Sequence, residues 1–188
     1  GKVHSNLEHF NMMYDILKAN NAKNIHFHLI TDGRDTKVNA AVNFVKELEE
    51  KISEDSNADI ASICGRYYAM DRDNNYDRTK IYYDLITKGI GLKVNNATNG
   101  VLSLYKKELT DEFLYPLIIN PEATIKDGDI ILWMNYRSDR AKQIMKTLTN
   151  SNFAEFPTYN FNDLKAYSFF PIDNEVTTKN ILNDLIVT

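Results

Sequence analysis

The sequence has few of the features that mark secreted or membrane proteins. Its 188 residues include one cysteine, Cys64, so no disulfide can form within the chain. This use of cysteine is typical of a reducing compartment. No apolar run approaches the roughly 20 residues that a membrane-spanning helix needs, and the chain does not open with the pattern of a secretory signal. We therefore expect a cytoplasmic protein with no membrane partner.

The chain also lacks an excess of positive charge. It has 22 lysines and arginines against 26 aspartates and glutamates, a net charge of -4. Without a basic stripe, a nucleic-acid partner is not expected, and any site for an anion must be local. A hydrophobic content of 43% is ordinary for a globular protein of this length and sufficient for one sizeable core.

Arginine is scarce and unevenly distributed. Only six of the basic residues are arginines, whereas the lysines are scattered. The arginines lie in three short segments: Arg34; Arg66, Arg72 and Arg78; and Arg137 and Arg140. An arginine side chain presents a planar fork of donors that grips a carboxylate or phosphate through two hydrogen bonds, which lysine cannot do. The grouping therefore indicates selection for anion-binding geometry.

Hydrophobic periodicity predicts helices and strands in alternation. Helices are expected from a capping box at Ser5–Glu8 to about residue 20, at 41–52, from a cap at Asp77 to Gly89, at 98–108, after Arg140 and at 178–186. Strands are expected at 24–30, 58–63, 130–136 and 165–170. Residues 64–76, which include CGRYYAMDRDNN, are expected to form a loop.

This order of elements predicts a single α/β domain over residues 1–188, with a mostly parallel sheet between two helical layers. The loops at 31–37, 64–76 and 137–138 each follow a strand. Ligands bind at this edge of open α/β sheets, and five of the six arginines lie there or at the start of the next helix. The sequence thus predicts a pocket for a small molecule with two anionic groups.

A purely structural alternative is that each arginine pairs with an aspartate close to it in sequence. The candidate pairs are Arg34–Asp35, Arg72 with Asp71 or Asp73, and Arg140–Asp139. Arg78 lies inside its helix, away from the loop tip, and is the arginine best explained by such a structural role.

Three residues near these loops add candidate chemistry. His4 directly precedes the expected helix start, where a histidine can donate a hydrogen bond to an anion. Asp35 lies beside Arg34 and could exchange a proton with a substrate hydroxyl. Asp32, which precedes Gly33, is typical of a structural turn residue.

Other patterns favour structural explanations. His26 and His28 face the same side of a strand, but no third metal ligand is indicated near them. The run Asp71-x-Asp73-x-Asn75 departs from a calcium loop, because Tyr76 and Tyr82 replace its glycine and glutamate. Cys64 lacks a marked partner for nucleophilic chemistry and is expected to be a small buried or loop thiol.

Four segments together resemble cofactor-independent phosphoglycerate mutase, the metal-dependent type of the alkaline phosphatase superfamily. They are HLITDGRDT, ASICGRYYAMDRDNNYDR, DEFLYP at 111–116 and IILWMNYRSDRAKQI, and VHS near the start also matches. The resemblance implies that substrate is contacted by His4, Arg34, Asp35, Arg66, Arg72, Arg137 and Arg140. It also implies that Asp35 is the catalytic residue of this set and that Arg78 is not part of it.

The resemblance covers nearly the whole chain but only part of such an enzyme. The family's phosphatase-like domain carries two manganese ions and a serine that is transiently phosphorylated. No matching Asp/His metal motif or serine context is present here, so residues 1–188 resemble the inserted substrate-binding domain alone, with no metal of its own. The expected partners are 3-phosphoglycerate or 2-phosphoglycerate and the phosphatase-like domain of the same polypeptide, in a monomer.

Two functions remain open at this point. In the first, the chain is the substrate-binding part of a glycolytic phosphoglycerate mutase, inactive by itself, which holds glycerate while phosphate passes through the serine. In the second, it is a non-catalytic anion-binding or regulatory module. A nucleic-acid binder is a weaker third possibility, which the net charge of -4 disfavours.

Overall fold

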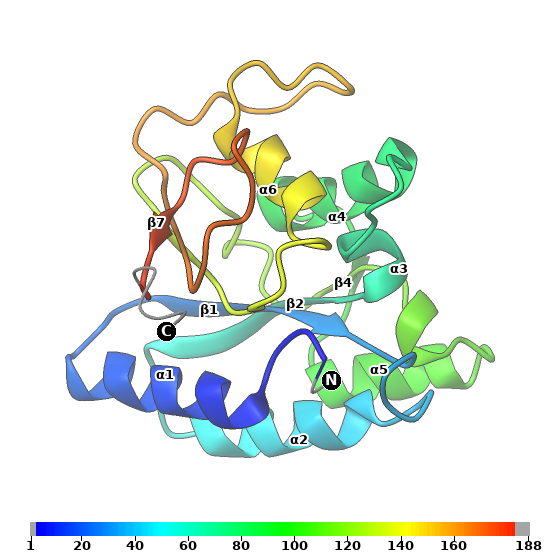
Figure 1. Cartoon of the computed structure of the whole chain (residues 1–188). Coiled ribbons are helices and arrows are strands. Elements are labelled where there is room, and N and C mark those ends of the chain that lie inside the picture. Colours follow the sequence, from blue (N-terminus) through cyan, green and yellow to red (C-terminus); the bar gives the residue numbers. More distant parts are fainter. Residues whose placement is uncertain (1–2, 183–188) are drawn as a thin grey trace, which may run out of the picture.

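The computed structural model describes residues 3–182, in which helices and strands alternate (Figure 1). The helices are α1 (Leu7–Ala19), α2 (Ala41–Ile52), α3 (Arg66–Ala69), α4 (Tyr76–Lys88), α5 (Ala97–Tyr105) and α6 (Lys142–Thr149), with a 3₁₀ turn η1 (Asp111–Phe113). The strands are β1 (Ile25–Thr31), β2 (Ala58–Gly65), β3 (Leu92–Lys93), β4 (Leu117–Ile118), β5 (Ile130–Trp133), β6 (Lys165–Ser168) and β7 (Lys179–Asn180). None of the helices in this range is long and apolar enough to cross a membrane.

The strands form two sheets. The first has the order β1-β2-β4-β3, with β1–β2 and β3–β4 parallel and β2–β4 antiparallel. The second has the order β5-β6-β7 and is parallel throughout. The predicted α/β class with mostly parallel strands is confirmed. The division into two sheets was not predicted, and it arises because β5 pairs with β6 instead of extending the β1–β2 sheet.

Two apolar clusters pack against opposite faces of the first sheet. Helices α1, α2 and α5 lie below it in Figure 1, whereas α3, α4 and α6 lie above it. The lower cluster is built from Tyr14, Val45, Leu48, Ile52, Val101 and Leu104. The upper cluster includes Tyr83, Leu85, Trp133, Ile144 and Met145. Neighbouring residues of β2 serve both, since Ile63 belongs to the lower cluster and Cys64 to the upper one.

Most element boundaries agree with the predictions. In α2, which was expected at 41–52, the apolar residues at helical spacing are all buried: Ala41, Val45, Leu48 and Ile52. Two predicted caps are wrong. Asn6, not Ser5, caps α1, because its side-chain oxygen accepts a hydrogen bond from the Glu8 N–H at 2.9 Å. Asp77 lies in the first turn of α4, whose N-cap is Asn75.

Three other local predictions need correction. The expected loop at 64–76 contains the short helix α3, which starts directly from Gly65. The expected strand at 130–136 ends at Trp133, because the chain turns away to form the loop that carries Arg137. In place of a helix from residue 178, Lys179–Asn180 pair with β6, and the Ile181 N–H donates to the Ser168 carbonyl at 2.8 Å. The rest of that prediction, residues 183–188, lies outside the described range.

Candidate anion-binding site

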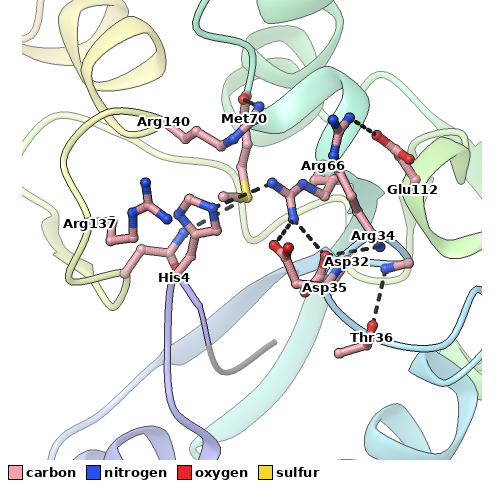
Figure 2. Close-up of polar contacts among 12 residues, drawn as sticks. His4, Asp32, Arg34, Asp35, Thr36, Arg66, Met70, Glu112, Arg137 and Arg140 are labelled. Carbon is pink, nitrogen blue, oxygen red and sulfur yellow. Dashed lines mark hydrogen bonds and ion pairs between the residues drawn. The ribbon is translucent and has the colours of Figure 1, made fainter.

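The predicted site residues come together from four separate parts of the chain (Figure 2). His4 lies before α1. The loop after β1 carries Asp32, Arg34 and Asp35. Arg66 is the first residue of α3, and the loop after β5 carries Arg137 and Arg140. A backbone hydrogen bond from Tyr136 N–H to the His4 carbonyl, at 2.9 Å, joins the first and last of these segments. The predicted grouping of these loops in space is therefore confirmed. Their predicted position at one edge of a single sheet is wrong, because β5 belongs to the second sheet.

Arg66 is the buried centre of the site. Only 4% of the residue is exposed, and its Nη1 donates to Asp32 Oδ1 and Asp35 Oδ2, each at 2.6 Å. Burial opposes the charge of the guanidinium, but the bonds to these two carboxylates outweigh it and raise the pKa of Arg66. Arg66 is thus a permanent cation that ties the loop after β1 to the end of β2.

Asp32 shapes the loop in which it lies. Its Oδ1 also accepts the backbone N–H groups of Arg34 at 3.2 Å and Asp35 at 3.1 Å. Burial would raise the pKa of Asp32, but the bonds from the Asp35 N–H and the Arg66 guanidinium hold it well below its usual range. The predicted turn role of Asp32 is confirmed, and the ion pair with Arg66 is added to it.

Asp139 gathers two arginines from different loops. Its Oδ2 accepts from Arg72 Nη1 at 2.8 Å and from Arg137 Nη2 at 3.4 Å. Burial favours the neutral acid, yet these guanidinium groups and nearby His4 lower the pKa of Asp139. Arg72 and Arg137 are both about half exposed, at 46% and 47% of their side chains, so they face the solvent side of the site.

Arg140 is the arginine of the site that forms no ion pair within 4 Å with a carboxylate of the described residues, although the charge of Asp139 acts on it. Its Nη1 donates to the Met70 carbonyl at 2.9 Å. Burial first, and then the positive charges of Arg66 and Arg72, lower the pKa of Arg140. A cation in such surroundings is stabilised by any anion that enters the site.

Arg34 is the most exposed member of the group, with 62% of its side chain accessible. Its Nη1 lies 3.5 Å from Glu112 Oε1 of η1 (Figure 2). Counting the whole site, five arginines face four carboxylates: Asp32, Asp35, Glu112 and Asp139. With His4 neutral, these described side chains carry one more positive than negative charge.

His4 is buried beside these cations, with 6% of the residue exposed. Its Nε2 lies 3.4 Å from Arg66 Nη2. Burial, followed by the charges of Arg66 and Arg137, lowers the pKa of His4. The imidazole is therefore neutral at neutral pH.

The structural alternative of pairing between sequence neighbours is wrong for each pair that was considered. Arg34 contacts Glu112 rather than Asp35, and Arg72 contacts Asp139 rather than Asp71 or Asp73. Arg140 donates to a backbone carbonyl rather than to Asp139. Apart from Arg137–Asp139, the ion pairs of the site cross from one loop to another, so they hold its loops together.

Sequence reasoning missed Glu112 and its neighbours in η1. A Cβ at Gly33 would lie 2.6 Å from Glu112 N, and one at Gly65 would lie 2.3 Å from Glu112 O. Two glycines thus let η1 pack directly against both loops of the site. The motif DEFLYP was a signal for this segment, but it gave no indication of which residues it touches.

Asp71 supports the loop that carries Arg72. Its carboxylate is buried and accepts from the Asn75 side chain at 2.9 Å and from Gln143 Nε2 of α6 at 2.9 Å. Arg78 also reaches Asp71, at 3.4 Å, and stacks over the Tyr67 ring at 4.0 Å. These contacts agree with the structural role predicted for Arg78.

The remaining polar candidates have structural partners. His26 Nδ1 contacts Asp59 at 2.8 Å and His28 Nδ1 contacts Ser62 at 2.7 Å, and burial lowers the pKa of His28 to about 4. Cys64 is fully buried, which raises the pKa of its thiol. Within residues 3–182, no three His, Cys, Asp or Glu side chains are grouped so that they could hold a metal ion.

Comparisons with known proteins agree with this arrangement. A family model described as BPG-independent PGAM N-terminus matches residues 1–174. The 2,3-bisphosphoglycerate-independent phosphoglycerate mutase of Bacteroides fragilis is 38% identical over 185 residues, which is 98% of this chain and 36% of that protein. Phosphoglycerate mutase 1 of this type from Methanosarcina barkeri is 41% identical over 163 residues, covering 84% of this chain and 32% of the relative.

A solved structure shows the same fold. It is the Leishmania mexicana phosphoglycerate mutase at low cobalt concentration, with a TM-score of 0.79 and 26% identity, and the match covers 89% of this chain and 33% of that one. The chain thus spans about a third of the length of the relatives it matches. A family match over 174 of 188 residues shows that this chain belongs to the family of N-terminal domains of bisphosphoglycerate-independent phosphoglycerate mutases.

Proposed function

We propose that this chain is the substrate-binding domain of a glycolytic phosphoglycerate mutase that interconverts 3-phosphoglycerate and 2-phosphoglycerate. The observation that carries the proposal is the convergence of five arginines on one site, with Arg140 lacking a carboxylate partner among the described residues. Membership of the mutase family supports the same substrate.

The charges of the site suit a phosphoglycerate. This substrate carries a carboxylate and a phosphoryl group, and guanidinium forks bind both in two places. In the proposal, substrate is held by His4, Arg34, Asp35, Arg66, Arg72, Arg137 and Arg140. Such groups accelerate phosphoryl transfer by positioning the reactants and stabilising charge.

Asp35 is the proposed proton acceptor and donor for the substrate hydroxyls. Its Oδ2 accepts a hydrogen bond from Arg66 Nη1 at 2.6 Å, which fixes the position of the carboxylate in the loop after β1. A carboxylate held in this way can take a proton from a hydroxyl as the phosphoryl group reaches it, and return the proton when phosphate leaves. The glycerate would stay bound by the arginines between the two steps.

The transfer itself would take place on a second domain of the same polypeptide, through a phosphoserine and two manganese ions. Since residues 3–182 offer no group of three metal-binding side chains, those ions would be held elsewhere in the protein. The role proposed for this chain is therefore to bind and orient the substrate. We expect the chain alone to show no mutase turnover, and turnover by the purified chain would contradict this division of roles.

Titration calorimetry of the chain with 3-phosphoglycerate tests the binding role. Arg66→Ala and Arg137→Ala are each expected to weaken binding at least about tenfold, because each removes a charged hydrogen-bond donor. Lys46→Ala serves as a control, since it removes one positive charge from the exposed face of α2, where Lys46 Nζ lies 3.8 Å from Glu50 Oε1. Binding that is unaffected by both arginine changes would refute the site.

A further inference from the structure

Two buried polar atoms face each other in the site without a hydrogen bond. His4 Nδ1 and Asp139 Oδ1 are both shielded from solvent, and residues 3–182 offer neither of them a hydrogen-bond partner. They lie 4.0 Å apart, too far for a direct hydrogen bond. Buried polar atoms are rarely left unpaired, because the loss of their hydration is unfavourable. The pair therefore needs an explanation beyond packing.

The neighbours of His4 determine which of its ring nitrogens carries the proton. Arg66 Nη2 approaches His4 Nε2 at 3.4 Å, and a guanidinium can only donate. Nε2 must then be the acceptor, so in the neutral ring the proton is on Nδ1. Burial and the adjacent arginines keep the ring neutral. His4 thus presents an N–H donor toward Asp139.

Asp139 presents the complementary acceptor. Its Oδ2 is occupied by Arg72 and Arg137, and its lowered pKa keeps the group ionised. Oδ1 can therefore only accept. A group that lies between His4 Nδ1–H and Asp139 Oδ1 must accept a hydrogen bond from His4 and donate one to Asp139. A hydroxyl does both, whereas a carboxylate or phosphoryl oxygen can only accept.

We propose that His4 and Asp139 together recognise a substrate hydroxyl, and that Asp139 is a further binding residue of the site. This inference rests on the proposed function, because a phosphoglycerate brings one free hydroxyl next to its two anionic groups. The arginines would bind the two anionic groups. The His4–Asp139 pair would hold the free hydroxyl in the bound substrate, before Asp35 takes its proton during phosphoryl transfer.

The test compares two ligands that differ only in that hydroxyl. The unaltered chain is titrated calorimetrically with 3-phosphoglycerate and with the phosphate ester of 3-hydroxypropionate, which lacks the 2-hydroxyl. We expect 3-phosphoglycerate to bind at least about tenfold more tightly, since a hydrogen bond to a charged group is worth at least that factor. In Asp139→Asn the ratio of the two dissociation constants should fall to near one. The amide oxygen would face Arg72, leaving the NH₂ group, a donor, toward the hydroxyl.

The ratio of the affinities for the two ligands shows whether Asp139 recognises the hydroxyl or only supports the fold. If Asp139 only positions Arg72 and Arg137, both ligands weaken by the same factor and the preference survives, which would overturn the inference. Asp139→Ala and His4→Ala should each abolish the preference as well, and Asp163→Asn, at an exposed carboxylate beside Lys165, should keep it. Equal binding of the two ligands by the unaltered chain also overturns the inference, whereas binding of neither overturns the proposed function itself.

Discussion

At the scale of single residues, burial separates arginines that carry the same charge. Arg66 is 4% exposed and bonds two carboxylates at 2.6 Å, whereas the Arg34 side chain is 62% exposed and lies 3.5 Å from Glu112. Removing one partner of a buried ion pair leaves the other charge unpaired away from water. An exposed pair is screened and contributes little. The two arginines should therefore differ in what they do for stability.

Arg66→Ala is expected to lower the free energy of unfolding by about 3 kcal/mol or more, because Asp32 and Asp35 lose their common partner. Arg34→Ala should cost less than about 1 kcal/mol. Urea denaturation of both variants at neutral pH measures the difference. Equal losses in the two variants would show that burial of Arg66 has no special role in holding the loops together.

At the scale of elements, η1 connects parts of the chain that meet only in the folded protein. Asp111 Oδ2 accepts the Ala41 N–H at 2.8 Å and so caps α2, whose own N-cap residue makes no side-chain bond. Thr31 Oγ1 donates to the Asp111 carbonyl at 2.6 Å. The next residue, Glu112, packs against Gly33 and Gly65. The position of η1 thus sets the spacing between the loops after β1 and β2.

Gly65→Ala should disturb this spacing. Its new Cβ would lie 2.3 Å from the Glu112 carbonyl oxygen and 2.7 Å from Leu114 N, which are backbone atoms that cannot rotate away. We expect a loss of about 2 kcal/mol or more in unfolding free energy and weaker binding of 3-phosphoglycerate. Thermal denaturation and calorimetry measure the two effects.

Gly128→Ala provides the comparison for this prediction. Nothing lies within 4 Å of its new Cβ, and only the backbone strain at φ +89° remains, worth about 1 kcal/mol. This variant should bind 3-phosphoglycerate like the unaltered chain. If Gly65→Ala behaved in the same way, the close packing of η1 would not control the site.

The loop between α3 and α4 depends on an ionised Asp71. The pKa of Asp71 is lowered from 3.8, because hydrogen bonds from Asn75 and Gln143 to its carboxylate outweigh the effect of burial. In the window between the lowered pKa and 3.8, the unfolded chain binds more protons than the folded one, so stability rises with pH there. This contribution is complete above the unfolded value and is lost as the pH falls through the folded one.

Asp71→Asn is therefore expected to cost about 1.5–3 kcal/mol at pH 6, the usual worth of hydrogen bonds to a charged group. The difference from the unaltered chain should narrow as the pH approaches 3. Urea denaturation at both pH values tests this, with the difference between the two proteins as the readout. If the difference in unfolding free energy between the two proteins were the same at both pH values, the charge of Asp71 would not stabilise the loop.

At the scale of the whole molecule, the first sheet lies between the two apolar clusters. Ile63 and Cys64 are consecutive residues of β2, are both fully buried and belong to different clusters. Two of the site loops leave the ends of β1 and β2, so these loops depend on both layers of helices. Loss of either cluster would remove support from one face of the same strands.

Unfolding is thus expected to be a single transition. Trp133 is the only tryptophan and lies in the upper cluster, so its fluorescence reports on that side, whereas far-UV circular dichroism reports on all the helices. In urea the two signals should change together, as they do for a domain that unfolds in one step. A fluorescence change at clearly lower urea would show that α4, α6 and β5 unfold separately from the rest.

Local patterns were enough to predict the elements whose signal lies within a few residues. The apolar spacing from Ala41 to Ile52 predicted α2, and Gly89 marked the end of α4. Patterns of this kind failed where pairing with a distant strand competes with local preference, as at Lys179–Asn180. Helix α3 was also missed, because its 4 residues are too few to show a helical pattern within the expected loop.

By itself, the sequence determined the α/β class, the family and the grouping of the arginines, because periodicity, motifs and rare residues can all be read locally. Only the tertiary structure decided which acid each arginine meets. Arg72 and Asp139 are 67 residues apart, and Arg34 and Glu112 are 78 residues apart. Such pairs depend on how η1, α3 and the loop after β5 pack around the first sheet. The same packing brings His4 and Asp139 face to face, since their contact exists only where loops from distant parts of the chain converge.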